Sequence, residues 1–222
     1  MLIEINQSNI DQRLIDQAVK VLRTGGIIIF PTDTVYAMGC DLNNKKALNK
    51  LSNLKGIKLK KANFSIISHD ISSLSAYVRQ IDRSTFKLLN RSLPGPFTFI
   101  LSATNEVPRI FGTNKKEIGI RIPDNTVVCK IVEQLGNPIA TTSLHDEEDK
   151  ILDYFIDPNQ IYERYEDLVD LIIDSGLGKL KASTIVNCVG GNIEIVRQGI
   201  GNIDLLFYLL IADPTKQSSS KK

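Results

Sequence analysis

The chain has 222 residues, of which 42% are hydrophobic and 23% charged, and a net charge of +2 at pH 7. This length can bury one substantial core, and no apolar run approaches the ~20 residues that a membrane span needs. Only two histidines are present, so a histidine metal cluster is excluded and we expect no metal site built by the protein. Three widely spaced cysteines without a Cys-x-x-Cys pair favour free, buried thiols in a reducing compartment.

The N-terminal half predicts helices and strands in alternation. Apolar spacing over 10–22 predicts a helix that ends at Gly25-Gly26. Four large apolar residues over 27–30 predict a short strand buried on both faces, and Pro31 ends it by removing a backbone donor. Asn44 is placed to cap a further helix with an apolar stripe. The N-terminus alternates like a strand and lacks a signal-peptide pattern, so we expect a cytoplasmic protein without a membrane partner.

The C-terminal half continues this pattern and ends in a hairpin. A stripe of aliphatic residues predicts a helix over 127–135, closed by Gly136. Gly190-Gly191-Asn192 joins two apolar segments and indicates a hairpin, so we expect a mixed sheet. One domain is expected over 1–211, followed by a flexible tail over 212–222. The other strands are predicted over 64–67, 97–103, 118–122, 138–142, 169–173, 183–189 and 193–198.

Small polar residues follow the predicted strand over 27–30. They are Thr32, Asp33 and Thr34, with Tyr36 just beyond. Open α/β sheets usually build ligand sites where buried strands end, which favours a functional site here. A helix cap or a closed turn would also use these residue types, and local chemistry leaves both interpretations open.

Lysines gather between Asp41 and Asp70, where seven occur without any acidic residue. Such a segment attracts phosphate and predicts a nucleotide or nucleic-acid partner. Lys45, Lys46 and Lys50 fall on the outer side of the helix that Asn44 caps, where a solvated helix face explains them. We favour phosphate binding for the other four, here named the basic segment, which is predicted to be a loop: Lys55, Lys58, Lys60 and Lys61.

No other nucleotide signature is present in the sequence. It contains no G-x-x-x-x-G-K-[ST] loop, no G-x-G-x-x-G fingerprint and no G-x-S-x-G elbow. An RNA-recognition motif would need interleaved aromatic residues, whereas aromatic residues make up only 6% of the chain.

Five motifs, in family order over 25–201, resemble those of the YrdC-like family, which makes threonylcarbamoyl-adenylate for tRNA modification. The resemblance implies an α/β fold: a single domain with a twisted mixed sheet, flanked by helices, around a large basic cavity. The motifs are FPTDTVYAMGCD over 30–41, LPGPFTFIL over 93–101, GIRIP over 119–123, TSL over 142–144, and STIV over 183–186 followed by RQG over 197–199.

The resemblance also implies a reaction and roles for single residues. Bicarbonate and L-threonine would form an N-carboxylate that attacks the α-phosphate of ATP and releases pyrophosphate, with Mg²⁺ accompanying ATP. Thr32 and Arg121 would bind threonine, with a bidentate pair between Arg121 and its carboxylate. The residues implied for nucleotide binding are Lys55, Ser143, Ser183 and Arg197, of which Lys55 and Ser143 are also the catalytic candidates. The residues expected to bind phosphate or RNA, with tRNA or double-stranded RNA as a further partner, are Lys58, Lys60 and Lys61.

Simpler explanations exist for several of these residues. Arg121 alternates with Ile118 and Ile120, so it faces either solvent or the cavity, and the resemblance favours the cavity. Ser183 could be no more than the first residue of a strand, and Ser143 could be a buried, hydrogen-bonded hydroxyl without a role in binding.

The chain departs from the family at two positions. The family pairs K-x-R with S-x-N, whereas this chain has Ile57 in place of the arginine and His145 in place of the asparagine. Both changes resemble the YciO branch of the family. Ile57 cannot replace a phosphate-binding guanidinium, and Lys58 or Lys60 would supply only a point charge. Two functions therefore stay open: a synthase, or an RNA-binding or accessory protein that kept the cavity for another ligand.

Overall fold

The computed structural model describes residues 1–144, 155–204, 206 and 208. The predicted tail over 212–222 lies outside this part. The first nine elements are β1 (Leu2–Glu4), α1 (Gln12–Arg23), β2 (Ile28–Phe30), β3 (Ala37–Asp41), α2 (Lys45–Leu54), η1 (Leu59–Lys61), β4 (Ser65–Ile67), η2 (Ser72–Ala76) and α3 (Arg83–Ser92). The next ten are β5 (Phe97–Ser102), α4 (Glu106–Phe111), β6 (Glu117–Arg121), α5 (Thr126–Leu135), β7 (Ile139–Ser143), α6 (Pro158–Tyr165), β8 (Leu171–Asp174), β9 (Thr184–Asn187), η3 (Val189–Gly191) and β10 (Glu194–Arg197).

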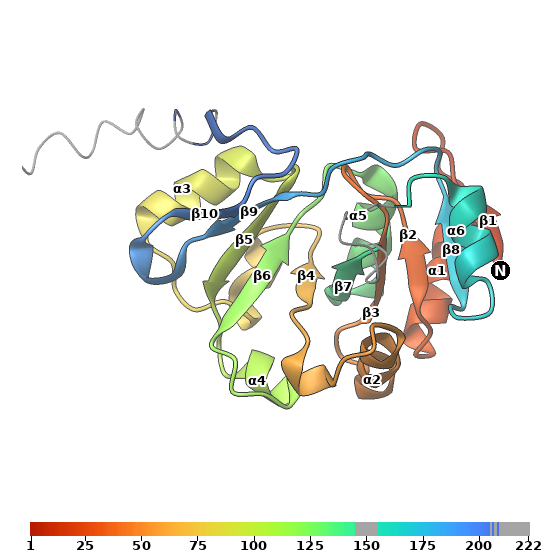
Figure 1. The fold of residues 1–222 in the computed structure, drawn as a ribbon, viewed down its shortest axis with the longest axis horizontal. Coiled ribbons are helices and arrows are strands. Elements are labelled where there is room, and N and C mark those ends of the chain that lie inside the picture. The colour runs from red at the N-terminus through yellow and green to blue at the C-terminus, as the bar shows by residue number, and fades with distance from the viewer. Residues whose placement is uncertain (145–154, 205, 207, 209–222) are drawn as a thin grey trace, which may run out of the picture.

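The strands form one mixed sheet that crosses the whole molecule, with α3 at one side and α1 and α6 at the other (Figure 1). Its order is β1-β8-β2-β3-β7-β4-β6-β5-β9-β10. The pairs β1·β8, β2·β8, β4·β6 and β5·β9 are parallel, and β2·β3, β3·β7, β4·β7, β5·β6 and β9·β10 are antiparallel. This confirms the predicted mixed sheet and its terminal hairpin.

Two cores cover the two faces of this sheet. On one face, α1 and α5 pack on each other and on buried residues such as Ile28, Phe30 and Leu171. On the other face, α2, α3, α4 and α6 contribute to a larger core that includes Ile29 and Ile120. The alternation of side chains along each strand sends neighbouring residues to different cores.

Most predicted elements are present, and the local signals behind them act as expected. The Asn44 side chain accepts a hydrogen bond from the Ala47 amide (3.0 Å) and so caps α2. Gly136 ends α5 with a φ of 78°. Among the cysteines, Cys40 and Cys188 are buried free thiols, whereas Cys129 is only partly buried.

Four elements were not predicted from the sequence: β3, α3, α4 and α6. β3 contains small residues with weak strand preference and is buried because of its central position in the sheet. α3 and α6 carried readable start signals, because Asp82 and Asp157 cap them and Pro158 occupies the first turn of α6.

Candidate functional site

One face of β6 is polar and the other is apolar. Ile118 and Ile120 are buried in the larger core, while Gly119 and Arg121 face the opposite side. Beyond the area that α1 and α5 cover, this opposite side presents small and hydroxyl-bearing residues from the neighbouring strands. Register brings Ser65 of β4 opposite Gly119.

A cavity of about 160 Å³ opens on this polar face. Its wall combines the ends of several strands, so residues from distant parts of the chain meet there. Four predicted site residues line it together: Arg121, Ser143, Ser183 and Arg197. Four further lining residues were not predicted from the sequence: Thr98, Thr141, Asn63 and Ser65. Thr98 belongs to the LPGPFTFIL motif and could have been found from that position.

Arg121 lines this cavity, and the polar run after β2 provides the hydrogen-bond partners of its side chain. Its Nη2 donates to the Thr32 hydroxyl (3.0 Å), to the Thr34 hydroxyl (2.6 Å) and to the Asp33 carboxylate (2.6 Å). Thr32 is fixed in turn because its hydroxyl donates to the Val35 carbonyl (2.7 Å) and accepts from the Thr34 amide (3.1 Å). The polar run after β2 therefore orients a buried guanidinium. This role of Asp33 and Thr34 was not predicted from the sequence, although both belong to the polar run after the predicted strand.

Burial and two neighbouring charges act on the pKa of Arg121. Burial lowers the pKa of Arg121, the ion pair with Asp33 counteracts this effect, and the positive charge of Arg197 lowers the pKa further. Among the described residues, the Nε atoms of both arginines and the Asp33 Oδ2 atom are buried without a hydrogen-bond partner. A buried polar atom without a partner is costly, so these three atoms mark the least satisfied part of the site.

The opposite wall is built by β5, β9 and β10. The hydroxyls of Thr98 and Ser183 share a hydrogen bond of 2.8 Å, and Arg197 Nη2 donates to the Ser183 carbonyl (2.9 Å). Gly199 makes this close approach possible, because an added Cβ would lie 2.2 Å from the Ala182 carbonyl oxygen. The RQG and STIV motifs thus meet in space.

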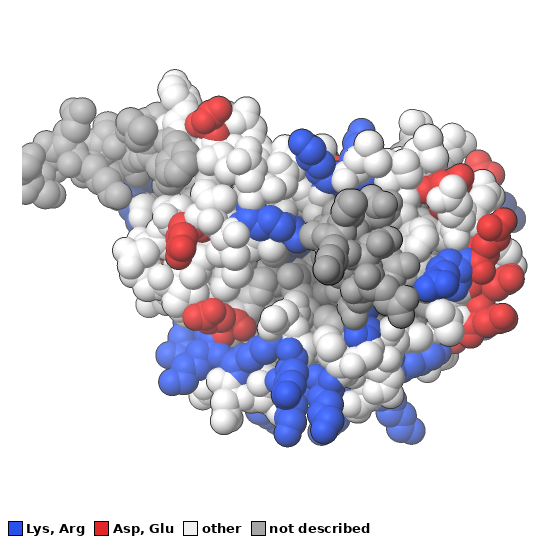
Figure 2. Space-filling view, in the orientation of Figure 1, with Lys and Arg blue, Asp and Glu red and all other residues white. Residues whose placement is uncertain are grey.

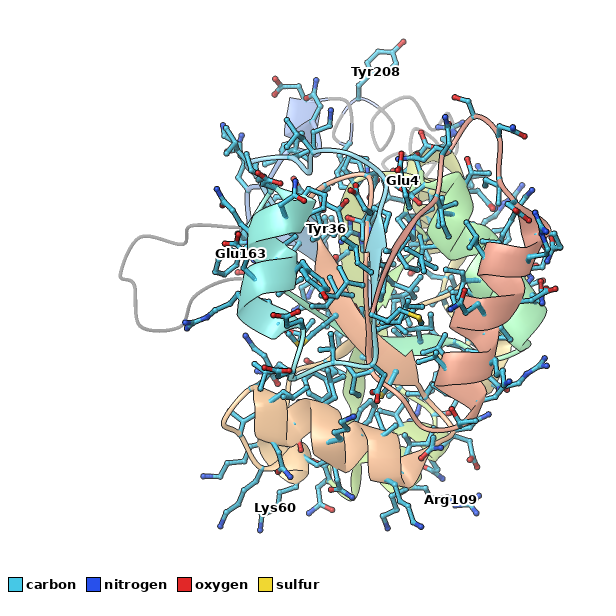
Figure 3. All side chains as sticks on the ribbon, turned by 90° about the vertical axis from the view of Figure 1, so that its right-hand side faces the viewer. Glu4, Tyr36, Lys60, Arg109, Glu163 and Tyr208 are labelled. Atoms are coloured by element: carbon cyan, nitrogen blue, oxygen red, sulfur yellow. The ribbon has the colours of Figure 1, made fainter. Side chains whose placement is uncertain are left out.

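Tyr36 follows the polar run in the chain and is buried among the strands (Figure 3). Its hydroxyl donates to the Gly176 carbonyl (2.7 Å) and accepts from the Ser175 amide (3.2 Å). Burial raises the pKa of Tyr36 to about 12, so the phenol stays protonated at neutral pH. Its contacts give Tyr36 a structural role.

The basic segment divides into two environments, which corrects the prediction of a loop throughout. Lys55 is buried and forms the C-terminal cap of α2, and it is not among the residues that line the cavity. Lys58, Lys60 and Lys61 are exposed, and the last two belong to η1. Lys and Arg side chains gather at this end of the molecule, over α2, η1 and α4 (Figure 2), and Lys60 projects outward there (Figure 3).

Of the two positions that depart from the family pattern, only Ile57 belongs to the described residues. Ile57 is 36% exposed, close to the end of α2. His145 lies outside the described residues. Within the described ranges, no group of three His, Cys, Asp or Glu side chains could hold a metal ion, and no helix is long and apolar enough to span a bilayer.

Several known proteins are similar to this chain. A family model for Sua5, YciO and YrdC proteins, described as telomere recombination, matches residues 20–199. The uncharacterized protein YciO of Escherichia coli K12 is 36% identical over 200 residues, which are 90% of this chain and 95% of YciO. A threonylcarbamoyl-AMP synthase of Nitrosococcus oceani is 30% identical over 126 residues, 57% of this chain and 68% of that protein.

Solved structures share the fold. The crystal structure of E. coli YciO matches with a TM-score of 0.82 and covers 91% of this chain and 97% of its own. P. abyssi Sua5, crystallised with L-threonine, matches with a TM-score of 0.85 at 22% identity, covering 94% of this chain and 60% of that longer one.

Proposed function

The chain belongs to the Sua5/YciO/YrdC family, and we propose that it is a nucleotidyltransferase of the threonylcarbamoyl-AMP synthase type. It would convert ATP, L-threonine and bicarbonate into threonylcarbamoyl-adenylate and pyrophosphate, for the modification of tRNA. One observation carries this proposal: Arg121 and Arg197 line one cavity with the hydroxyl residues Ser143 and Ser183. Two cations and a set of hydroxyls suit a reaction that brings several anionic groups together.

Arg121 would bind the carboxylate of threonine. Three oxygen acceptors fix its Nη2, and its Nε lacks a protein partner among the described residues. Binding through a guanidinium that is already oriented avoids most of the entropy cost of ordering a long side chain. Thr32, whose hydroxyl contacts the same Nη2, lies beside the place where the substrate would sit.

Arg197 and Ser183 would bind the nucleotide at the opposite wall. The buried Arg197 Nε again lacks a partner among the described residues, and a phosphate oxygen would satisfy it. Ser143, at the end of β7, lies on the same cavity and would contact the reacting phosphate. Positive charge placed where negative charge develops stabilises the transition state of phosphoryl transfer.

Mg²⁺ fits this site only as the partner of ATP. The Asp33 carboxylate is already paired with Arg121, so the protein offers no dedicated set of oxygen ligands here. Mg²⁺ usually keeps several waters and is held largely by the phosphates of its nucleotide. We therefore expect Mg²⁺ to be bound mainly by ATP.

The test is pyrophosphate release from ATP, measured with both threonine and bicarbonate and with each omitted in turn. We expect release to rise several-fold only when both are present. Arg121→Lys should abolish this increase, because an ammonium cannot keep the Nη2 contacts to Thr32, Asp33 and Thr34 and still offer a second nitrogen to the substrate. If ATP turnover is no higher with both compounds than with either omitted, the synthase proposal fails.

The second candidate is a non-synthase RNA-binding or accessory protein. The exposed side chains of Lys58, Lys60 and Lys61, together with the uncharged Ile57, favour it. Phosphate contacts made by exposed lysines would give binding that weakens steeply with salt. RNA binding without threonine-dependent pyrophosphate release would support this candidate against the synthase.

A further inference from the structure

A cavity of about 570 Å³ opens on the face of the sheet opposite to the candidate site. Thr98 of β5 lines the candidate site, whereas Leu101 of the same strand lines this cavity. These two positions are three residues apart, so their side chains point to opposite faces of the sheet. η2, α3 and the segment between them form the other walls. The residues of this cavity therefore have no part in the proposed reaction.

The lining of this cavity has an apolar base and a polar rim. Its base contains four buried residues: Leu74, Val78, Leu89 and Leu101. Phe86 lines the opening and is 46% exposed, and no other phenylalanine among the described residues is exposed. Every polar residue of the lining is exposed as well. An apolar centre within a polar rim is typical of a protein–protein interface.

The surroundings of the cavity favour a helix as its occupant. β5 is paired with β6 on one side and with β9 on the other, so an extended peptide finds no free strand edge here. A small polar ligand would need polar groups inside the cavity, whereas no polar side chain of its described lining is buried. An amphipathic helix needs neither feature, because it inserts apolar side chains at i, i+3 or i+4 and i+7 into a groove.

The segment that forms most of the walls is basic. Residues 71–91 include four basic residues and one acidic residue, Asp82. The Asp82 carboxylate caps α3, because it accepts hydrogen bonds from the amides of Ser84 and Thr85 (2.9 Å each). The one negative charge of this segment thus serves the helix itself.

Two arginines place positive charge beside the opening. Arg79 lines the cavity, and its Nε donates to the Ala103 carbonyl (2.9 Å), while neither of its Nη atoms bonds to a described residue. Arg83 is exposed and precedes Phe86 by three residues, so the two are neighbours on the surface of α3. Arg83 forms no ion pair within the described ranges. Complementary charge on a partner would be negative.

We propose that this cavity is a docking site for an acidic amphipathic helix of a partner protein. Its apolar side chains would contact Phe86 and Leu89, and its carboxylates would lie beside Arg79 and Arg83. A second copy of this chain would bring the same arginines against these, so charge opposes the pairing of two such faces. Docking on the face opposite to Arg121 leaves the candidate site accessible.

The experiment is fluorescence anisotropy of the full chain with two labelled, side-chain-stapled helical peptides. One peptide has leucines at i, i+3, i+4 and i+7 and glutamates and alanines elsewhere, and the other has lysine in place of every glutamate. We expect the glutamate peptide to bind at micromolar concentrations and the lysine peptide at least roughly tenfold more weakly. Phe86→Ser should weaken the glutamate peptide at least roughly tenfold, as loss of a central aromatic anchor predicts.

Matched variants separate the cavity from the rest of the surface. Leu168 is 45% exposed and lies between α6 and β8, so Leu168→Ser is the control for Phe86→Ser and should bind as wild type does. Arg79→Gln/Arg83→Gln should weaken the glutamate peptide about three- to tenfold and lower its dependence on salt. Arg164→Gln, on α6, should change neither. Thermal denaturation checks that every variant folds.

Several results would overturn the docking site. They are no binding of the glutamate peptide, equal binding of the two peptides, or equal losses in Phe86→Ser and Leu168→Ser. A wild-type dimer in sedimentation that Phe86→Ser dissociates would assign the cavity to a second copy instead. Binding to phosphatidylglycerol vesicles that Phe86→Ser abolishes would assign it to a membrane.

A second variant keeps the test valid if Phe86→Ser does not fold. Gln80→Glu changes an exposed residue of the rim and adds a carboxylate there, so it should weaken the glutamate peptide and not the lysine peptide. Equal effects on both peptides would contradict the proposal. None of these measurements involves ATP or threonine, so the docking site and the synthase can fail independently.

Discussion

Arg121 and the exposed lysines of the basic segment carry the same charge in opposite environments. Arg121 is 7% exposed and is held by Thr32, Asp33 and Thr34, whereas Lys60 projects into solvent from η1. A buried charge must be paired and is then fixed in position, so it can recognise one ligand group at one place. An exposed charge is solvated and acts through a field that salt screens. The two regions should therefore respond to mutation in different ways.

The largest effect is expected for removal of the buried charge. Arg121→Met leaves the Asp33 carboxylate buried without its partner, and we expect the free energy of unfolding to fall by about 3–5 kcal/mol. Urea denaturation measures this change. The double variant Asp33→Asn/Arg121→Met should lose less than the single one, and Lys60→Met should stay within ~0.5 kcal/mol of wild type. A loss below ~1 kcal/mol in Arg121→Met would show that the pair is not buried as described.

A smaller effect is expected for Arg197, a half-buried arginine that serves the ligand more than the fold. Arg197→Met removes a donor that lacks a protein partner, and we expect ATP affinity to fall about 10- to 150-fold. Calorimetric titration measures it. Arg109→Met, which changes an exposed arginine of α4, is the control and should bind ATP as wild type does. Equal affinities for the two variants would remove Arg197 from the nucleotide site.

Position 57 tests the missing family arginine. Ile57→Arg, combined with His145→Asn, should raise threonine-dependent pyrophosphate release by roughly tenfold, because a guanidinium can form charge-assisted bonds to phosphate. Ile57→Lys should give a smaller gain, since it lacks the planar fork. A double variant that folds and binds ATP without any gain would mean that the chain differs from the synthases in more than these two residues.

The smallest effect on the folded protein is expected at the exposed lysines. The triple variant Lys58→Ala/Lys60→Ala/Lys61→Ala should keep its free energy of unfolding within about 0.5 kcal/mol per substitution. Its affinity for duplex RNA should fall, and the slope of log affinity against log salt should decrease by about 0.9 for each phosphate contact that is lost, by analogy with B-DNA. Filter binding at several salt concentrations measures the slope. The double variant Lys45→Ala/Lys46→Ala, on the outer side of α2, is the control.

Local sequence patterns sufficed for most elements and for one side-chain direction. Alternation with Ile118 and Ile120 placed Arg121 on the opposite face of its strand, and the structure finds it there, in the cavity. Asn44 and Gly136 ended their helices through backbone chemistry that acts within a few residues. Elements without a strong apolar period, such as β3 and α4, were missed.

Only the tertiary structure decided which charges meet. Arg121 pairs with Asp33, 88 residues away in the chain, although β3, β7 and β4 separate β2 from β6 in the sheet. Lys55 was expected beside its lysine neighbours, yet α2 buries it while they stay exposed. Lys115 carried no motif, yet it lines a cavity together with Asn63 and Thr98, because β6 lies between β4 and β5. The period of the sequence pattern determines which face of a strand a side chain occupies. The neighbouring strand and the register of the pairing depend on packing between segments far apart in the chain, which no local pattern encodes.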